Sequence, residues 1–202
     1  RSTLFPYTTL FRSTNFAPDG LVYLDIETTG LSHIKGAKIV EIAMLKIQNG
    51  KEERFESLVN PRHPIPPESS KIHSIYDAMV ESSPEFKNIA KDVAGFIGTN
   101  TVVCHNAVFD LAFVHKELFD SGVRTSGIYF VDTLKIARQY FSFESNVLGN
   151  IADAIGVEVE TKHRAMADVL TMFRVAEYLF ANMYRKGIDT IEPSLYEYSP
   201  KG

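Results

Sequence analysis

Residues 21–31 have the sequence LVYLDIETTGL, an apolar segment that ends in two carboxylates, two threonines and a glycine. The apolar run predicts a buried β-strand over residues 21–27. Because alternate residues of a strand point to one face, we expect Asp25 and Glu27 to lie side by side. Two like charges held together repel each other and are costly to bury. The stretch therefore predicts a strand end that holds a cation between its carboxylates.

The remainder of the chain predicts strands that are followed by alternating helices and strands. Residues 37–61 carry alternating apolar residues on both sides of Asn49-Gly50, which is typical of a tight hairpin. Apolar spacing predicts strands over 101–106 and 128–133 and helices over 86–97, 108–122, 134–140, 146–156 and 165–184. Residues 60–70 are rich in proline and predict a surface loop. The pattern predicts an α/β domain: a mixed central sheet, three antiparallel strands plus parallel strands, flanked by helices.

Composition limits the classes of protein that the chain can belong to. The 202 residues suffice for one ordinary domain, and 45% hydrophobic with 23% charged residues is typical of a globular protein. No apolar run has the length of a membrane span. The single cysteine, Cys104, suits the reducing cytoplasm, where we expect the protein to act. A formal charge of −4 argues against a DNA-binding protein with a long footprint, but not against an enzyme that grips a strand end.

The first residues need a separate interpretation. Residues 6–13, PYTTLFRS, match the translated end of a widely used sequencing adapter, so we interpret residues 1–13 as an artefact outside the fold. Residues 14–20 are then expected to be a linker left by a truncated gene. We expect the functional domain over residues 21–186 and a loosely ordered tail over residues 187–202.

Further acidic residues follow the predicted strands or begin the predicted helices. Asp110 follows the strand at 101–106, and Asp168 lies near the start of the last helix. With Asp25 and Glu27 they would form an all-oxygen site, which Mg²⁺ or Mn²⁺ prefers. Two such ions can activate a water and stabilise a leaving oxygen in phosphoryl displacement. His163, five residues before Asp168, would accept the proton of that water.

These residues resemble the three motifs of the DEDDh (DnaQ-like) 3′–5′ exonuclease family, which includes the proofreading epsilon subunit of bacterial DNA polymerase III. The motifs here are LDIETTGL (24–31), HNAVFD (105–110) and HRAMAD (163–168), in the family's order and spacing. The resemblance covers residues 21–179. It implies a ribonuclease H-like fold, two-metal hydrolysis that releases nucleoside monophosphates, and His163 as the general base.

The resemblance also implies substrate contacts. Family members place the TTGL segment around the 3′-terminal nucleotide, which carries over to Thr28 and Thr29 as polar contacts and Leu31 as an apolar base contact. The first histidine of the family's IHGI segment corresponds to His73, although Ser74 stands here where glycine is usual. The implied substrate is the 3′ end of single-stranded or frayed DNA, in proofreading or repair, and a DNA polymerase subunit is a candidate partner.

Three other interpretations remain open from the sequence. The first is a 3′–5′ exoribonuclease of the same superfamily, because discrimination of the 2′-hydroxyl depends on pocket shape. The second is a non-catalytic module that binds nucleic acid or a polymerase. The third is a phosphomonoesterase with Asp25 as nucleophile. His105 and Asn106 are expected to shape the turn before a helix, and His115 is expected on a helix surface.

Overall fold

The computed structural model describes residues 20–158, 164–188 and 191–197. The proposed artefact at residues 1–13 and most of the linker at 14–20 lie outside the described residues, so both interpretations stay predictions. The expected limits of the domain and of the tail also stay predictions.

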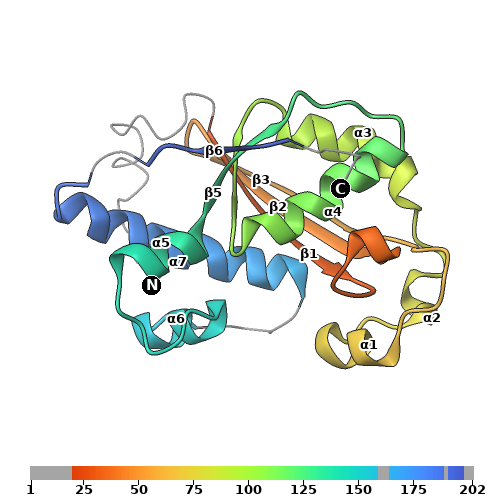
Figure 1. Cartoon of the computed structure of the whole chain (residues 1–202), viewed down its shortest axis with the longest axis horizontal. Helices are drawn as coiled ribbons and strands as arrows, with labels where there is room; N and C mark the ends of the chain where they lie inside the picture. The colour runs from red at the N-terminus through yellow and green to blue at the C-terminus, as the bar shows by residue number, and fades with distance from the viewer. Residues whose placement is uncertain (1–19, 159–163, 189–190, 198–202) are drawn as a thin grey trace.

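A six-stranded mixed sheet forms the centre of the protein (Figure 1). Its strands, in spatial order, are β3 (Lys51–Leu58), β2 (Ile39–Gln48), β1 (Leu21–Thr28), β4 (Thr101–Cys104), β5 (Ile128–Asp132) and β6 (Ser194–Tyr196). Strand β2 pairs antiparallel with both β3 and β1, whereas β1, β4 and β5 run parallel to one another. The predicted α/β fold with a mixed sheet is therefore confirmed.

The hairpin between β2 and β3 follows from its two turn residues. Asn49 and Gly50 both have positive φ angles, of 51° and 75°. These angles suit a tight two-residue turn whose twist matches the flanking strands, and Asn-Gly adopts them at low cost. The predicted hairpin is confirmed, and it sets the register of β2 against β3.

Helices cover both faces of the sheet (Figure 1). Val22, Leu24 and Ile26 of β1 pack on one face with α3 (Phe86–Ile97) and α4 (Ala107–Asp120). Leu21 and Tyr23 point to the other face, which α5 (Thr133–Tyr140), α6 (Leu148–Ile155) and α7 (Ala165–Arg185) cover. The alternation along β1 therefore places Asp25 and Glu27 on the α7 side.

Two parts of the chain differ from the expected elements. The predicted surface loop at residues 60–70 is wrong in its last part, because α1 (Pro67–His73) begins there and α2 (Asp77–Val80) follows. Proline at the first helical position lacks only an N–H that has no intrahelical partner. The loosely ordered tail is wrong for residues 194–196, because β6 pairs antiparallel with β5 and covers its edge. A short 3₁₀ helix, η3 (His33–Lys35), was also not predicted.

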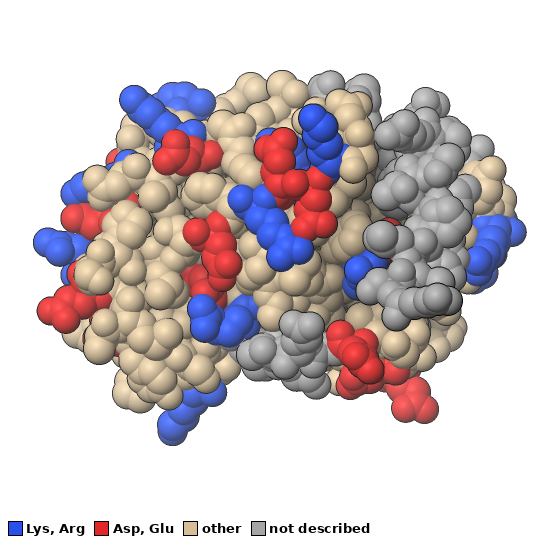
Figure 2. All heavy atoms as spheres, turned by 180° about the vertical axis from the view of Figure 1, so that it is seen from behind, with Lys and Arg blue, Asp and Glu red and all other residues tan. Residues whose placement is uncertain are grey.

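The surface carries charges of both signs. Figure 2 shows acidic and basic side chains interspersed on the face opposite to Figure 1. Within the described residues, no helix is long and apolar enough to cross a membrane. The expected cytoplasmic location stays a prediction.

Candidate active site

The end of β1 presents two carboxylates toward α7. Asp25 lies opposite Ala43 of β2, and Glu27 lies opposite Glu41. Directly after Glu27 the register shifts, since Thr28 pairs with Ile39. Such a bulge ends regular pairing and bends the strand, as is common beside active sites. The strand therefore delivers Asp25 and Glu27 side by side before the chain turns away.

Asp110 and Asp168 come to the same place from the first turns of two helices. Asp110 lies in α4, directly after β4, and Asp168 lies in α7. Because β1 and β4 are parallel, both strands end at the same edge of the sheet. Figure 1 shows the start of α7 beside the end of β1, and one carboxylate oxygen each from Asp25, Glu27 and Asp168 lies within 4.8 Å of the others. Asp110 borders this trio.

The proximity of these groups changes their acidity. Burial, together with the charges of Asp110 and Asp168, holds the pKa of Asp25 well above its usual range. Burial, Asp168 and Glu41 raise the pKa of Glu27 from 4.5 to about 8. Burial likewise raises the pKa of Asp110. Glu27 therefore holds a proton that an ordinary carboxyl group would have lost at neutral pH.

The donor set fits a hard divalent cation. Carboxylate oxygens are the ligands that such ions prefer, and Asp25, Glu27 and Asp168 offer them at close range. Burial and mutual repulsion raise the pKa values of Asp25 and Glu27, and a cation between the carboxylates would offset the repulsion. We therefore identify this cluster as the candidate metal site that the sequence predicted.

The raised pKa of Glu27 predicts how the stability of the metal-free protein depends on pH. The folded protein keeps a proton on Glu27 that the unfolded chain releases above pH 4.5. Because the unfolded state then binds fewer protons, the free energy of unfolding falls as the pH rises toward about 8. We expect a loss of about 1–3 kcal/mol between about pH 5.5 and about pH 8.5, measured by urea denaturation in EDTA.

In the variant Glu27→Gln, the free energy of unfolding should fall less over the same pH range. Glu144→Gln is a matched control, because Glu144 is exposed. Its substitution should leave the dependence of the unfolding free energy on pH as in the wild type. A wild-type protein whose stability rises with pH across this window would contradict the interpretation.

A buried ion pair beside the cluster was missed by sequence reasoning. Glu41 of β2 is 1% exposed and binds Arg164, the residue just before α7. A signal was present in the sequence, because Glu41 is a single charge inside the apolar run IVEIAML. Its partner could not be identified, since Arg164 lies far away in the chain.

Asp132 organises the turn behind Asp110 and was also missed. Its carboxylate accepts hydrogen bonds from the backbone N–H of Asn106, at 3.0 Å, and of Leu134, at 2.9 Å. Asn106 has a left-handed φ of 75°, and the His105 ring contacts the Thr133 hydroxyl at 2.9 Å. The expectation that His105 and Asn106 shape the turn before α4 is confirmed.

A groove of about 780 Å³ opens beside Glu27 and is lined by all four residues predicted to bind substrate. Leu31 is 86% exposed there, so its side chain is available to an apolar partner. The Thr28 hydroxyl donates to the Gly30 carbonyl at 2.8 Å, and the Thr29 hydroxyl accepts from the Lys38 N–H at 2.9 Å. Both hydroxyls therefore hold the turn after β1, and their contact with substrate stays a prediction.

His73 lies on the wall of this groove at the end of α1. Its Nδ1 accepts a hydrogen bond from the Ile75 N–H at 3.0 Å, which fixes the orientation of the buried ring. Ser74 takes the left-handed conformation, with φ of 58° and ψ of 23°, and its N–H donates to the Ser70 carbonyl. Serine thus adopts the cap that glycine would adopt without strain. The contact of His73 with substrate stays a prediction.

His163 lies outside the described residues. The structure describes Arg164, the next residue, and α7 after it. The role of His163 as general base therefore stays a prediction from its motif.

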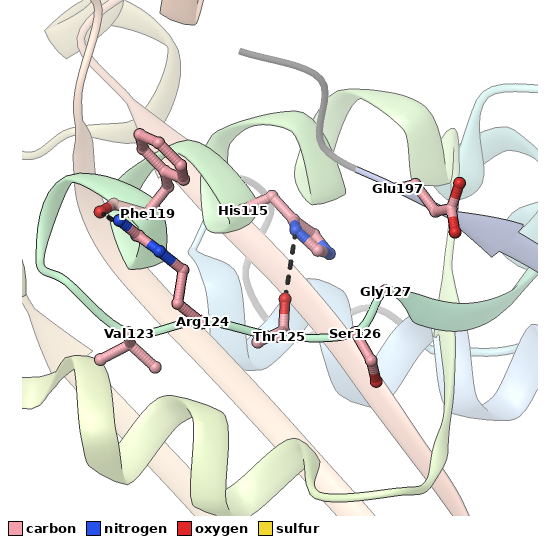
Figure 3. Close-up of a pocket in the computed structure, with 8 residues that line it drawn as sticks. All are labelled: His115, Phe119, Val123, Arg124, Thr125, Ser126, Gly127 and Glu197. Atoms are coloured by element: carbon pink, nitrogen blue, oxygen red, sulfur yellow. Dashed lines mark hydrogen bonds between the residues drawn. The ribbon is translucent and has the colours of Figure 1, made fainter.

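A second cavity of about 360 Å³ lies at the end of α4 (Figure 3). His115 is 3% exposed, so the expectation of a helix-surface histidine is wrong; Tyr196 of β6 covers it, with ring centroids 5.1 Å apart. The His115 ring contacts the Thr125 hydroxyl at 3.4 Å. Arg124 donates to the Phe119 carbonyl at 3.0 Å and stacks on the Phe119 ring. These side chains bind one another, and none belongs to the carboxylate cluster.

The fold and the carboxylate cluster are those of a nuclease-like domain with a candidate metal site. Residues 22–176 match the family described as exonuclease (RNase_T). The chain belongs to this exonuclease family. Its domain is thus of the 3′–5′ exonuclease class, which confirms the predicted family and class of enzyme.

Two relatives place the chain within this family. The DNA polymerase III subunit epsilon of Haemophilus influenzae is 33% identical over 162 residues, which are 75% of this chain and 63% of that protein. The 3′-5′ exonuclease DinG of Bacillus subtilis is 35% identical over 149 residues, 73% of this chain and 16% of that protein. The chain thus spans only part of the length of these relatives.

Solved structures agree with the fold. Exonuclease X, in complex with 5′ overhanging duplex DNA, has a TM-score of 0.61 at 26% identity and covers 83% of this chain and 93% of its own. The zinc-bound complex of Escherichia coli exonuclease I with single-stranded DNA has a TM-score of 0.72 at 16% identity, over 83% of this chain and 41% of its own. The second likeness concerns the fold alone.

Proposed function

We propose that the chain is a metal-dependent exonuclease that removes nucleotides from single-stranded or frayed 3′ ends of DNA. The observation that carries the proposal is the trio Asp25, Glu27 and Asp168, whose ligand atoms lie within 4.8 Å beside an open groove. Membership of the exonuclease family and likeness to exonuclease X, solved with DNA, support it.

In this proposal the four carboxylates hold two Mg²⁺ or Mn²⁺ ions. Such ions, when bound, supply a nucleophilic water and stabilise the negative charge of the leaving oxygen. Asp25 lies at the centre of the cluster, where the charges of Asp110, Asp168 and Glu27 all act on it. His163 is proposed to accept the proton of the attacking water.

The groove is proposed to receive the terminal nucleotide. Its walls combine the apolar side chains of Leu31, Ile72 and Phe109 with the polar side chains of His73 and Lys35. Apolar side chains can pack on a base, while a lysine can contact a phosphate. A groove of this kind grips a strand end locally, which suits a protein of net negative charge.

Leu31 allows a test of the groove that leaves the fold intact. Leu31→Ala should raise KM by about 3–10-fold with kcat little changed, because it removes apolar contact that is equal in ground and transition states. Ile34→Ala is a matched control: Ile34 is 70% exposed in η3, three residues after Leu31, but does not line the groove. Initial rates on single-stranded DNA would give kcat and KM for both variants. A KM of Leu31→Ala equal to that of the wild type would contradict the assignment of Leu31.

The function itself is tested with short 5′-labelled single-stranded DNA in Mg²⁺, in Mn²⁺ and in EDTA. Products that shorten progressively from the 3′ end, and that are absent in EDTA, would support the proposal. A folded protein that degrades no DNA with either metal would contradict it. Matched RNA of the same sequence tests the substrate class, and faster cleavage of RNA would replace DNA as the proposed substrate.

A DNA polymerase is the proposed partner. Support comes from the relatives, which include DNA polymerase III subunit epsilon and DNA polymerase III PolC-type proteins. An exonuclease beside a polymerase would remove mismatched 3′ ends, which fray more easily than paired ones.

A further inference from the structure

Glu41 occupies a costly position in the sheet. It is the third residue of the buried part of β2, directly opposite Glu27, and it is 1% exposed. Ala43, two residues further along β2, packs with α7, so Glu41 points to the α7 face. A carboxylate buried near Asp25 and Glu27 is unfavourable unless a cation and hydrogen bonds satisfy it.

Arg164 satisfies Glu41 from the start of α7. Its Nε lies 3.1 Å from both carboxylate oxygens, and its Nη2 donates to Oε1 at 2.6 Å. The Ala165 N–H donates to Oε2 at 3.0 Å. Both oxygens of Glu41 are therefore engaged, and the guanidinium geometry is one that lysine could not reproduce.

The same contacts replace a local helix cap. Arg164 is the N-cap residue of α7 and makes no side-chain cap hydrogen bond to the helix. Glu41 accepts one of the N–H groups that have no intrahelical partner, so β2 caps α7 across the fold. The Asp168 N–H donates to the Arg164 carbonyl at 3.0 Å. The first turn, which carries Asp168, is thus tied to β2 through Arg164.

We propose that Glu41 and Arg164 are a positioning pair that holds Asp168 in register with Asp25 and Glu27 for metal binding. The pair fixes α7 to β2, and β2 fixes β1 through the opposed residues Glu27 and Glu41. Neither Glu41 nor Arg164 lines the groove. This inference rests on the proposed function, because the pair acts through the carboxylate cluster.

Mn²⁺ affinity separates positioning from two simpler roles. Arg164→Ala removes a positive charge near the cluster, so electrostatics alone would make Mn²⁺ bind more tightly. A merely structural ion pair would lower the melting temperature and leave Mn²⁺ affinity unchanged. Positioning predicts weaker binding, by about 10–100-fold, as for other residues that orient metal ligands. Calorimetric titration of the folded, metal-free wild type and Arg164→Ala with Mn²⁺ shows whether the affinity rises, falls or stays the same.

Activity gives a second readout. Arg164→Ala should lower kcat by about 10–100-fold with KM for DNA little changed, because the groove is left intact. Arg164→Lys keeps the positive charge but loses the paired hydrogen bonds. Its kcat should therefore lie between that of the wild type and that of Arg164→Ala. Arg174→Ala is the matched control, since Arg174 lies on the same helix and pairs with Glu177 at 3.4 Å, away from the cluster.

The double variant Glu41→Gln with Arg164→Ala keeps the proposal testable if Arg164→Ala alone does not fold. Arg164→Ala alone leaves a buried carboxylate unpaired, whereas the double variant removes that charge and should be the more stable protein. It still lacks the paired hydrogen bonds, so its Mn²⁺ affinity should stay below that of the wild type. Wild-type or tighter Mn²⁺ affinity in Arg164→Ala or in the double variant would overturn the proposal.

The titration also distinguishes this inference from the proposed function. Mn²⁺ binding requires no turnover, so a wild type that binds Mn²⁺ but degrades no DNA would contradict the exonuclease and still test the pair. A wild type that binds no Mn²⁺ would overturn both.

Discussion

Alanine in place of Asp25 or Asp168 is expected to lower kcat by about 10³-fold or more, while the protein stays folded. Each substitution removes a ligand from a cluster whose metal ions stabilise the transition state by several kcal/mol, and each 1.36 kcal/mol is a factor of ten. The metal-free variants should be at least as stable as the wild type, because burial and repulsion, which together raise the pKa of Asp25, disfavour its charge in the folded protein. Initial rates on labelled DNA and urea denaturation in EDTA measure the two effects.

Asp92→Ala is the matched control for these variants. Asp92 is an exposed aspartate of α3, on the face of the sheet opposite to α7, and its loss should leave kcat unchanged. If Asp25→Ala and Asp168→Ala unfolded the protein, the carboxylates would have a structural role, and the assignment of a metal site would be wrong.

The second large effect is expected at His163. His163→Ala should lower kcat by about 10²–10⁴-fold, which is the usual contribution of a general base. Because His163 is expected to accept a proton without binding metal, Mn²⁺ affinity should change little. Calorimetry separates this result from the result for Asp168→Ala, which should lose affinity. Wild-type kcat in His163→Ala would remove the residue from the mechanism.

The pH dependence of the reaction tests the same role. A general base works in its neutral form, so kcat/KM of the wild type should rise through a pKa near 6.5. His163→Ala should lack this step, and added imidazole should restore part of its rate. A wild-type profile without the step would argue against a histidine base.

The features that could be predicted from the sequence are determined by residues close to them in the chain. Asp25 and Glu27 obey the two-residue period of a strand, and Asn49-Gly50 specifies its own turn. Asp168 and Asp110 were predicted because each lies in a short motif at a helix start. In all these cases the information lies within a few residues of the position.

The features that were missed depend on distant parts of the chain. The pairing of Glu41 with Arg164 joins β2 to the last helix, and no local pattern in either segment identifies the other. Residues 194–196 are too short for a periodic signal, and β6 forms because β5 offers an unpaired edge. The burial of His115 follows from that same strand, since Tyr196 covers it.

The cluster joins both ends of the domain, because Asp25 lies in the first strand and Asp168 in the last long helix. Because contacts between distant segments require a long loop to close, we expect these charges to meet late in folding, and a divalent ion then has little to bind before that point. Interactions absent from the folding transition state change the rate of unfolding and leave the rate of folding nearly unaltered. We therefore expect the bound ion to slow unfolding, which lengthens the lifetime of the native state, without accelerating folding.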